Sequence, residues 1–194
     1  MKTFFAWLKK RAVSGLLILL LLILIFNPNA KAFLLKQLIS TGLFSAEIEK
    51  NNTNNYNYPV NAYFNFTDSE GKLISTTDLK GHVVFINFWA SWCPPCRAEM
   101  PSLESLYKKL KNDDRFVFVF INEDEDKTKA KNYLEEYHYT FPLSASSGNV
   151  PNELFNGSLP TTVVINKEGK IVLKHEGMAG YDTEAFIVQL KELL

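Results

Sequence analysis

The sequence predicts an α/β domain in which helices flank a central mixed β-sheet, with an apolar segment in front of it. Two nearly unbroken apolar runs, Val83 to Trp89 and Phe116 to Ile121, have the composition of strands that are covered on both faces. Apolar residues at helical spacing follow each run, and two hairpin signals lie before and after them. The order strand, helix, strand, helix, and then two strands and a helix indicates a mixed sheet with helices on both faces.

The chain begins with basic residues that precede an apolar run. Residues 12–30 follow Lys9 to Arg11 and carry no charge. At ~1.5 Å per residue these 19 residues form about 28 Å of helix, close to the ~30 Å of a hydrocarbon core. We therefore predict a signal anchor over residues 1–32 with a transmembrane helix at about 12–30, which places a single-pass protein in the inner membrane with its domain in the periplasm. Ala30 to Ala32 also has the small-x-small form of a peptidase site, so the alternative is a cleaved signal peptide and a secreted domain.

Residues 33–61 are expected to join this anchor to the domain. Phe33 to Leu43 is amphipathic and suited to a membrane interface. Glu47 to Asn61 is polar and rich in Asn, with few aliphatic side chains to bury, and we interpret it as a linker. The folded domain is then expected to occupy residues 62–194.

Local patterns predict the elements of this domain in order. Tyr63 to Thr67 and Lys72 to Ser75 flank a turn signal and indicate an N-terminal hairpin. A second hairpin is expected from Thr162 to Leu173. The three predicted helices have apolar residues one turn apart, at Leu103, Leu106, Tyr107 and Leu110, at Ala130, Tyr133, Leu134 and Tyr137, and at Phe186, Leu190 and Leu193. The last of these helices begins near Asp182-Thr183, which can cap it.

The charge distribution argues against a nucleic acid partner. The chain has 21 basic and 21 acidic residues, but the first 32 residues hold five basic and no acidic ones. The remainder therefore carries 16 positive against 21 negative charges, a net charge of −5. Because a nucleic-acid-binding domain is typically basic, we expect no such partner.

Cys93 and Cys96 are the two cysteines of the chain, and they lie directly after the first central strand at the start of a helix. A helix N-terminus stabilises a thiolate through its unpaired N–H groups and its dipole, so Cys93 is the predicted nucleophile. Cys96 can then displace a mixed disulfide and close a redox cycle. Pro94 and Pro95 lack an N–H, which weakens this stabilisation and leaves the Cys96 N–H as the expected donor to Cys93.

Other interpretations of the pair are a half zinc site, a buried inert pair and a permanent structural disulfide. A zinc site needs two further ligands, and His82, His138 and His175 show no ligand spacing. A disulfide that closes so short a loop stabilises little. The acidic run from Glu123 to Asp126 is interpreted as a helix start rather than a metal site. We expect neither a metal nor an organic cofactor.

The segment from Phe88 to Pro101, which reads FWASWCPPCRAEMP, resembles the active site of thioredoxin-fold proteins of the TlpA/ResA/CcmG-like branch. Leu159 to Thr162 resembles the cis-proline loop of the same branch, and the likeness covers about residues 62–194. The resemblance implies a thioredoxin fold with an extra N-terminal hairpin. It also implies an exported, often membrane-tethered thiol-disulfide oxidoreductase.

Carried over to this chain, the resemblance makes Cys93 the attacking cysteine, Cys96 the resolving one and Pro160 the cis-proline. A cis X-Pro bond turns the backbone groups of the preceding residue outward, so Leu159 can hydrogen bond an extended substrate. The alternative for Pro160 is an ordinary trans proline at a strand entry.

Two further positions carry predictions from the same resemblance. Cytosolic thioredoxins have a buried acid where this chain has Asn87, and Glu99 matches the acid that some branch members place near the cysteines. Glu99 is therefore a candidate general base for Cys96, and an exposed first-turn carboxylate is its alternative. Trp92 is predicted to shield the disulfide and offer substrates a flat apolar contact, with a plain core role as its alternative.

Together these features predict an extracytoplasmic thiol-disulfide oxidoreductase whose substrates are disulfides of exported proteins. The resemblance suggests apocytochrome c as one of them. Because the chain has two cysteines, a separate thiol donor in the membrane is expected to regenerate the pair. A redox-silent membrane-tethered binding module and a thiol-dependent peroxidase are the alternatives. No sequence feature marks an interface, so we expect a monomer.

Overall fold

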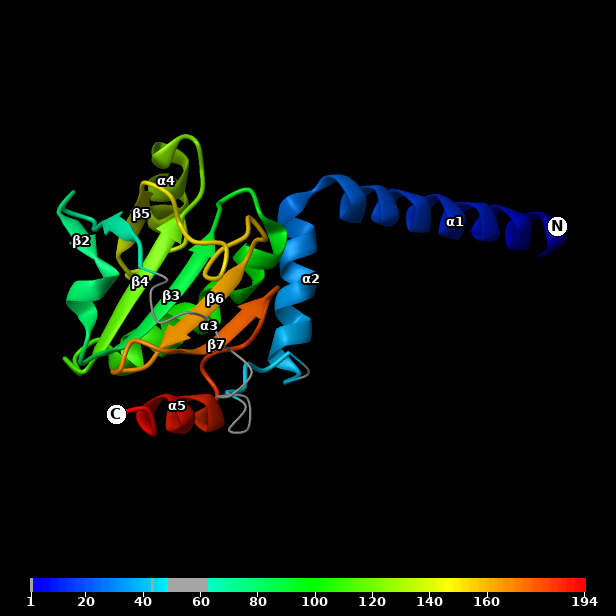
Figure 1. Ribbon diagram of the computed structural model, residues 1–194. Coiled ribbons are helices and arrows are strands. Elements are labelled where there is room, and N and C mark those ends of the chain that lie inside the picture. The colour runs from blue at the N-terminus through cyan, green and yellow to red at the C-terminus, as the bar shows by residue number, and fades with distance from the viewer. Residues whose placement is uncertain (1, 43, 49–62) are drawn as a thin grey trace.

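The computed structural model describes residues 2–42, 44–48 and 63–194, which form a domain with one long helix projecting from it (Figure 1). Most of the Asn-rich segment interpreted as a linker, residues 47–61, lies outside the described residues. The helices are α1 (Lys2–Phe26), α2 (Pro28–Ser40), α3 (Pro94–Leu110), α4 (Lys127–Glu136), α5 (Glu184–Lys191) and the 3-10 helix η1 (Thr76–Leu79). The strands are β1 (Asn65–Thr67), β2 (Leu73–Ser75), β3 (Val83–Trp89), β4 (Phe116–Asn122), β5 (Leu143–Ser147), β6 (Thr161–Ile165) and β7 (Ile171–Glu176).

The seven strands form one mixed sheet in the order β2-β1-β5-β4-β3-β6-β7. β3 pairs in parallel with β4, and β4 with β5, whereas the other neighbours are antiparallel. All seven residues of β3 are buried, as expected for a central strand covered on both faces. The mixed sheet confirms the predicted class, and β5 is an additional strand that the sequence patterns did not predict.

Buried side chains form two clusters on opposite faces of the sheet, because alternate residues of β3 belong to different clusters. The first cluster contains Phe85 and Trp89 of β3 together with side chains of α3, α4 and α5. The second contains Ile86 and Phe88 and is closed by Leu154, with η1 and the segment around it packed at its edge. Helices were expected on both faces, but a 3-10 helix and a loop close the second one.

The N-terminal helices are separated by a sharp bend at Asn27. Asn27 Oδ1 accepts hydrogen bonds from the N–H groups of Asn29 and Ala30, which caps α2. Within the described residues no single helix has the length and hydropathy needed to cross a membrane, whereas Val13–Phe26 and Pro28–Ser40 have them together as a pair bent by 91°. The expected continuous helix over residues 12–30 is therefore wrong, because the cap at Asn27 ends α1 and starts a new helix.

α2 packs on α3 at one side of the domain (Figure 1). Ala32 of α2 is buried, and Ser45 beyond it forms a parallel bridge with Gly180. Ala46 and Ile48 then enter the first hydrophobic cluster. The first part of the segment expected to connect anchor and domain is thus packed on the domain itself.

Candidate active site

The two cysteines lie where strand β3 passes into helix α3. β3 ends at Trp89 and α3 begins at Pro94, so Cys93 occupies the N-cap position of α3. Cys93 and Cys96 form a disulfide with their Cα atoms 5.3 Å apart. The backbone N–H of Cys96 donates to Cys93 Sγ at 3.2 Å. This is the donor that the two prolines were expected to leave, and its presence confirms that prediction.

The local sequence explains why the helix begins at the nucleophile. Proline is well suited to the first helical position, because its fixed φ matches the helix and its missing N–H would have no partner there. Pro94 and Pro95 fill the first two positions of α3. The positive end of the helix therefore begins at Cys93 and stabilises a thiolate there when the pair is reduced.

Exposure differs along the active-site loop. Cys96 is fully buried and Cys93 is 4% exposed, whereas the adjacent Trp92 is 62% exposed. The alternative core role for Trp92 is therefore wrong. Its ring offers a flat apolar surface next to Cys93. Because Cys93 is slightly exposed and Cys96 is not, an approaching disulfide meets the nucleophile before the resolving cysteine.

The loop that precedes β6 reaches the same edge of the sheet as the cysteines. The Leu159–Pro160 peptide bond is cis, as the resemblance implied, and Pro160 is buried. β6 begins at Thr161, which pairs with Phe88 near the end of β3. Leu159 packs against the hydrophobic cluster that contains both cysteines. The fold thus brings together two predicted motifs that lie far apart in the sequence.

Glu99 is fully buried in the first half of α3, three residues beyond Cys96. Asn87 Nδ2 donates to Glu99 Oε1 at 2.9 Å, and the Ala179 N–H donates to Oε2 at 3.2 Å. Burial raises the pKa of Glu99 from 4.5 to about 8, and these two hydrogen bonds offset the effect only in part. The alternative of an exposed carboxylate is therefore wrong, and a role toward Cys96 stays a prediction.

Asn87 connects Glu99 to the neighbouring strand. Its Nδ2 also donates to Thr162 Oγ1 at 2.9 Å, while its Oδ1 has no hydrogen-bond partner among the residues described. Tyr181 is fully buried close by, and burial, followed by the charge of Glu99, raises the pKa of its hydroxyl well above the usual value. Burial therefore disfavours a negative charge on Glu99, and the hydrogen bond from Asn87 offsets this only in part.

Asp124 fixes the loop before Cys93, and the sequence patterns did not single it out. Asp126 of the same acidic run caps α4, as a helix start requires, but Asp124 is buried. Its carboxylate accepts from the Ser91 N–H at 3.2 and 3.1 Å and from Ser91 Oγ at 3.1 Å. The one available signal was its position two residues after a buried strand. In the described part of the chain no cluster of three His, Cys, Asp or Glu side chains suits a metal ion.

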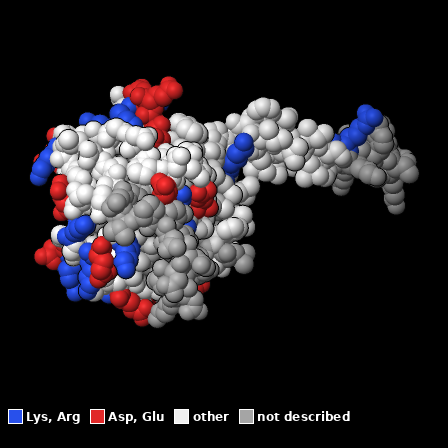
Figure 2. All heavy atoms as spheres, viewed as in Figure 1, with Lys and Arg blue, Asp and Glu red and all other residues white. Residues whose placement is uncertain are grey.

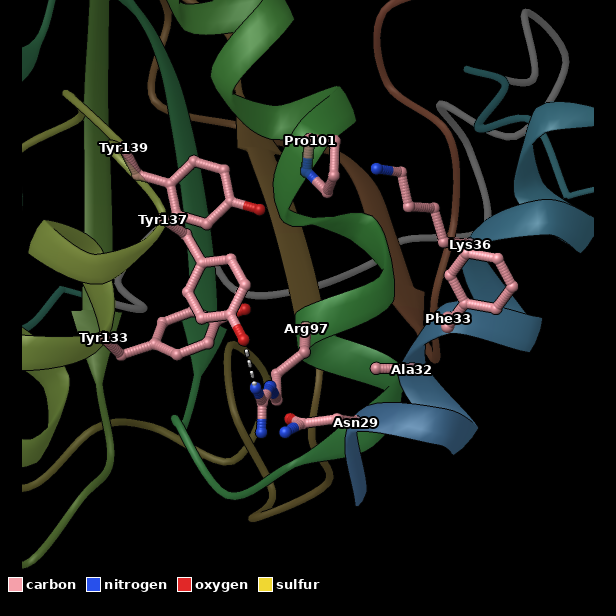
Figure 3. Close-up of a pocket in the computed structure, with 9 residues that line it drawn as sticks. All are labelled: Asn29, Ala32, Phe33, Lys36, Arg97, Pro101, Tyr133, Tyr137 and Tyr139. Carbon is pink, nitrogen blue, oxygen red and sulfur yellow. Dashed lines mark hydrogen bonds between the residues drawn. The ribbon is translucent and has the colours of Figure 1, made fainter. Parts of the chain in front are cut away.

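Arg97 packs the first turn of α3 between two other helices. Its guanidinium lies 4.8 Å from the ring centre of Tyr133 and 5.8 Å from that of Tyr137, and Nη2 donates to the Tyr137 hydroxyl at 3.2 Å. Figure 3 shows these two rings, from α4 and its C-cap position, on one side of Arg97 and Asn29 and Ala32 of α2 on the other, around a pocket of about 220 Å³. The redox end of α3 is therefore adjacent to the N-terminal half of α2.

Comparisons with known proteins agree with this geometry. The model of the Redoxin family matches residues 56–185. The thiol-disulfide oxidoreductase ResA of Bacillus cereus is 40% identical over 112 residues, which are 57% of this chain and 64% of that relative. ResA of Bacillus subtilis (strain 168) is 36% identical over 132 residues, or 68% of this chain and 72% of that relative. The chain thus covers less than two thirds of the length of the Bacillus cereus relative.

Solved structures show the same fold. The exposed lipoprotein thioredoxin of Streptococcus pneumoniae superposes with a TM-score of 0.55 and 31% sequence identity, covering 68% of this chain and 99% of that one. The mixed sheet, the flanking helices and the position of the cysteine pair are therefore those of the thioredoxin fold. By the extent of the family match and the identity to the Bacillus subtilis relative, the chain belongs to the redoxin family and is a homologue of the ResA thiol-disulfide oxidoreductases.

Proposed function

We propose that this chain is a membrane-anchored, extracytoplasmic thiol-disulfide oxidoreductase that reduces disulfides of exported proteins, apocytochrome c among them. The observation that carries the proposal is the disulfide between Cys93 and Cys96 at the N-terminus of α3, with the Cys96 N–H directed at Cys93 Sγ. The cis-proline loop at Leu159 and the exposed Trp92 beside Cys93 supply a surface for a protein substrate.

The chemistry follows from the order of exposure of the two sulfurs. In the reduced protein the Cys93 thiolate attacks one sulfur of a substrate disulfide, and the other substrate sulfur leaves as a thiolate. The Cys96 thiolate then attacks Cys93 Sγ, which forms the internal disulfide and releases the second substrate sulfur. Two electrons pass from the pair to the substrate, and two protons end on the substrate thiols.

Glu99 is suited to the second step, in which Cys96 loses its proton. A group that accepts a proton near neutral pH works best when its pKa lies near that pH, and burial raises the pKa of Glu99 to about 8. Its place three residues beyond Cys96 puts the two side chains on one face of α3. The surrounding protein excludes bulk water from this exchange.

Regeneration of the dithiol requires a second protein. The chain has two cysteines, so electrons cannot be relayed within it. A separate thiol donor in the membrane, reached by a protein anchored through α1, meets this requirement. A retained anchor is favoured over cleavage near Ala32, because Ala32 is buried in α2 against the domain.

Trapping the mixed disulfide tests the proposal. In the Cys96→Ser variant, expressed in the native host, Cys93 forms mixed disulfides with substrates that cannot be resolved. We expect these species on gels without reductant and their loss on gels with reductant, while the Cys93→Ser/Cys96→Ser chain serves as the matched control. Absence of any trapped species, together with failure of the reduced wild-type chain to reduce insulin disulfides, contradicts the proposal and favours a redox-silent binding module.

A further inference from the structure

We infer that α2 lies flat on the surface of a lipid bilayer and holds the redox domain there in a fixed orientation. The inference rests on the membrane anchor in the proposed function and extends it. The surface concerned consists of Lys31, Phe33, Leu34 and Leu38, which are exposed, and is called the outer face of α2.

α2 is apolar on two sides, of which the domain covers only one. Ala32 is buried toward α3, and Leu35 and Ile39, at i+3 and i+7, are half-buried on the same side. On the outer face Phe33 is 62% exposed, Leu34 46% and Leu38 42%. The exposed surface of α2 also carries Lys36 and Gln37, so large apolar side chains are mixed there with polar ones, as on a helix that lies at a membrane interface.

The contact with the domain prevents α2 from turning to bury that face. Gly180 approaches α2 so closely that a Cβ atom there would lie 3.1 Å from Ile39 Cγ2. Just beyond the helix, the Gly180 N–H donates to the Phe44 carbonyl oxygen at 2.6 Å, and the Ala46 N–H donates to the Gly180 carbonyl oxygen at 3.0 Å. These backbone bonds fix the rotation of α2, and its outer face stays directed away from the sheet.

The direction of α1 shows what covers the outer face. α1 leaves the N-terminal end of α2 on the side away from the sheet (Figure 1), and the two axes differ by 91°. From Val13 to Phe26 its apolar side chains are exposed around the helix, and Figure 2 shows an arm that is white over most of its length. If α1 runs along the normal of a bilayer, α2 therefore lies in the plane of the membrane with its outer face against the lipid.

The uncharged part of α1 agrees with this arrangement in length. α1 has 25 residues, but Arg11 is its last charged residue, and at ~1.5 Å per residue the uncharged residues 12–26 are about 22 Å long, less than the ~30 Å of a hydrocarbon core. An interfacial helix sinks ~5–10 Å into the boundary between headgroups and acyl chains, which shortens the distance that α1 has to cross. Placing α2 in the membrane interface thus accounts both for the bend between α1 and α2 and for the short uncharged part of α1.

Charge favours lipid over a second copy of the chain as the cover. Lys31 shares the outer face with Leu34 and Leu38, because they follow one another at i, i+3 and i+7. Its ammonium group complements lipid phosphates, as on other interfacial helices. In a symmetric dimer through the same face, each Lys31 ammonium group would be buried against the partner's α2, which carries no acidic side chain to pair with it.

The placement has a consequence for the redox pair. The first turn of α3, which carries Cys96 and Arg97, packs beside the N-terminal half of α2. Packed helix axes lie ~8–10 Å apart, so the cysteines are held about one helix above the headgroups. A dithiol at this height suits exchange with a thiol donor embedded in the same membrane.

Site-directed spin labels test the placement in the full chain. In a Cys93→Ser/Cys96→Ser background, single L34C, L38C and V188C variants are labelled with a nitroxide and reconstituted into phosphatidylethanolamine and phosphatidylglycerol vesicles. We expect labels at 34 and 38 to collide more with oxygen than with a water-soluble nickel complex. The control label at Val188, an exposed apolar residue of α5, should show the reverse. Adding L34D, but not L34M, should shift the label at 38 toward nickel.

Each contrary result has a separate meaning. Labels at 34 and 38 that are as accessible to nickel as the label at 188 overturn the inference, and so does spin-spin broadening at 34, which would place a second copy on the outer face. A chain that does not float with the vesicles overturns the anchor as well. Insulin reduction by the unlabelled wild-type chain is measured in parallel, so a failure of the proposed redox function is seen independently of the placement.

Discussion

The Glu99→Gln substitution isolates the effect of the buried carboxyl on stability. In the folded protein burial raises the pKa of Glu99 from 4.5 to about 8, so the folded state holds a proton that the unfolded state releases in this range. The stabilisation is complete below about pH 4.5 and is lost as the pH rises through about 8. Each pH unit between these values changes the free energy of unfolding by ~1.4 kcal/mol.

Between about pH 5 and about pH 7.5 the free energy of unfolding of the wild-type chain should therefore fall by ~3 kcal/mol relative to Glu99→Gln. Gln faces the Ala179 N–H with an oxygen or an amino group, which adds an offset of ~1–3 kcal/mol that does not vary with pH. The quantity to compare between the two chains is thus the slope of the free energy of unfolding against pH, and not its value at one pH. Both chains are kept oxidised, so that no cysteine titrates, and are unfolded in urea at a series of pH values.

Glu104→Gln on the same helix is the matched control with the opposite sign. Burial acts to raise the pKa of Glu104, but hydrogen bonds from Lys108 and Thr140 outweigh it and hold that pKa below the usual value. This substitution should therefore lower stability near neutral pH, with the difference fading toward acid. If plots of the free energy of unfolding against pH run parallel for the wild-type and Glu99→Gln chains, then burial does not raise the pKa of Glu99 and the argument is refuted.

Three further substitutions probe separate parts of the structure. Gly180→Ala places a Cβ atom 3.1 Å from Ile39 Cγ2, so amide hydrogen exchange in α2 should accelerate while global unfolding changes little; unchanged exchange would contradict close docking of α2. Asp124→Ala removes the hydrogen bonds to Ser91 and should lower the free energy of unfolding, measured in urea titrations, by ~1–3 kcal/mol. An unchanged urea midpoint would show that the loop before Cys93 is stable without Asp124. Trp92→Ala should leave stability within ~0.5 kcal/mol because the ring is 62% exposed, yet slow insulin reduction; an equal rate would exclude a substrate contact.

Several features were predictable because they depend on neighbours in the chain. The unbroken apolar composition of β3 marked it as a central strand, and Thr183 caps α5 where the sequence placed the cap. The N-cap position of Cys93 and its bond from the Cys96 N–H follow from the two prolines between them. In each case the deciding interaction spans a few residues, so the pattern is visible without the fold.

Other features escaped prediction because their partners are distant. Leu143–Ser147 consists mostly of small and polar residues, and it forms β5 because β4 and β1 offer hydrogen bonds on both sides. The continuous membrane helix is an exception, because its break is local: Asn27 accepts hydrogen bonds from Asn29 and Ala30, and the apolar composition of the run hid this cap. Asp124 looked like part of a helix start until the fold buried it beneath Ser91.

By itself, the sequence determined the class of the sheet, the redox pair and the end of the helix on which the nucleophile lies, because local propensity and the chemistry of two cysteines act at short range. Tertiary structure alone decided that Glu99 is buried, that Trp92 is exposed and that α2 is docked against Gly180. These properties depend on which surfaces meet when distant segments pack. The proton affinity of Glu99 is a property of that packing, since desolvation arises only once the domain has closed around the carboxyl.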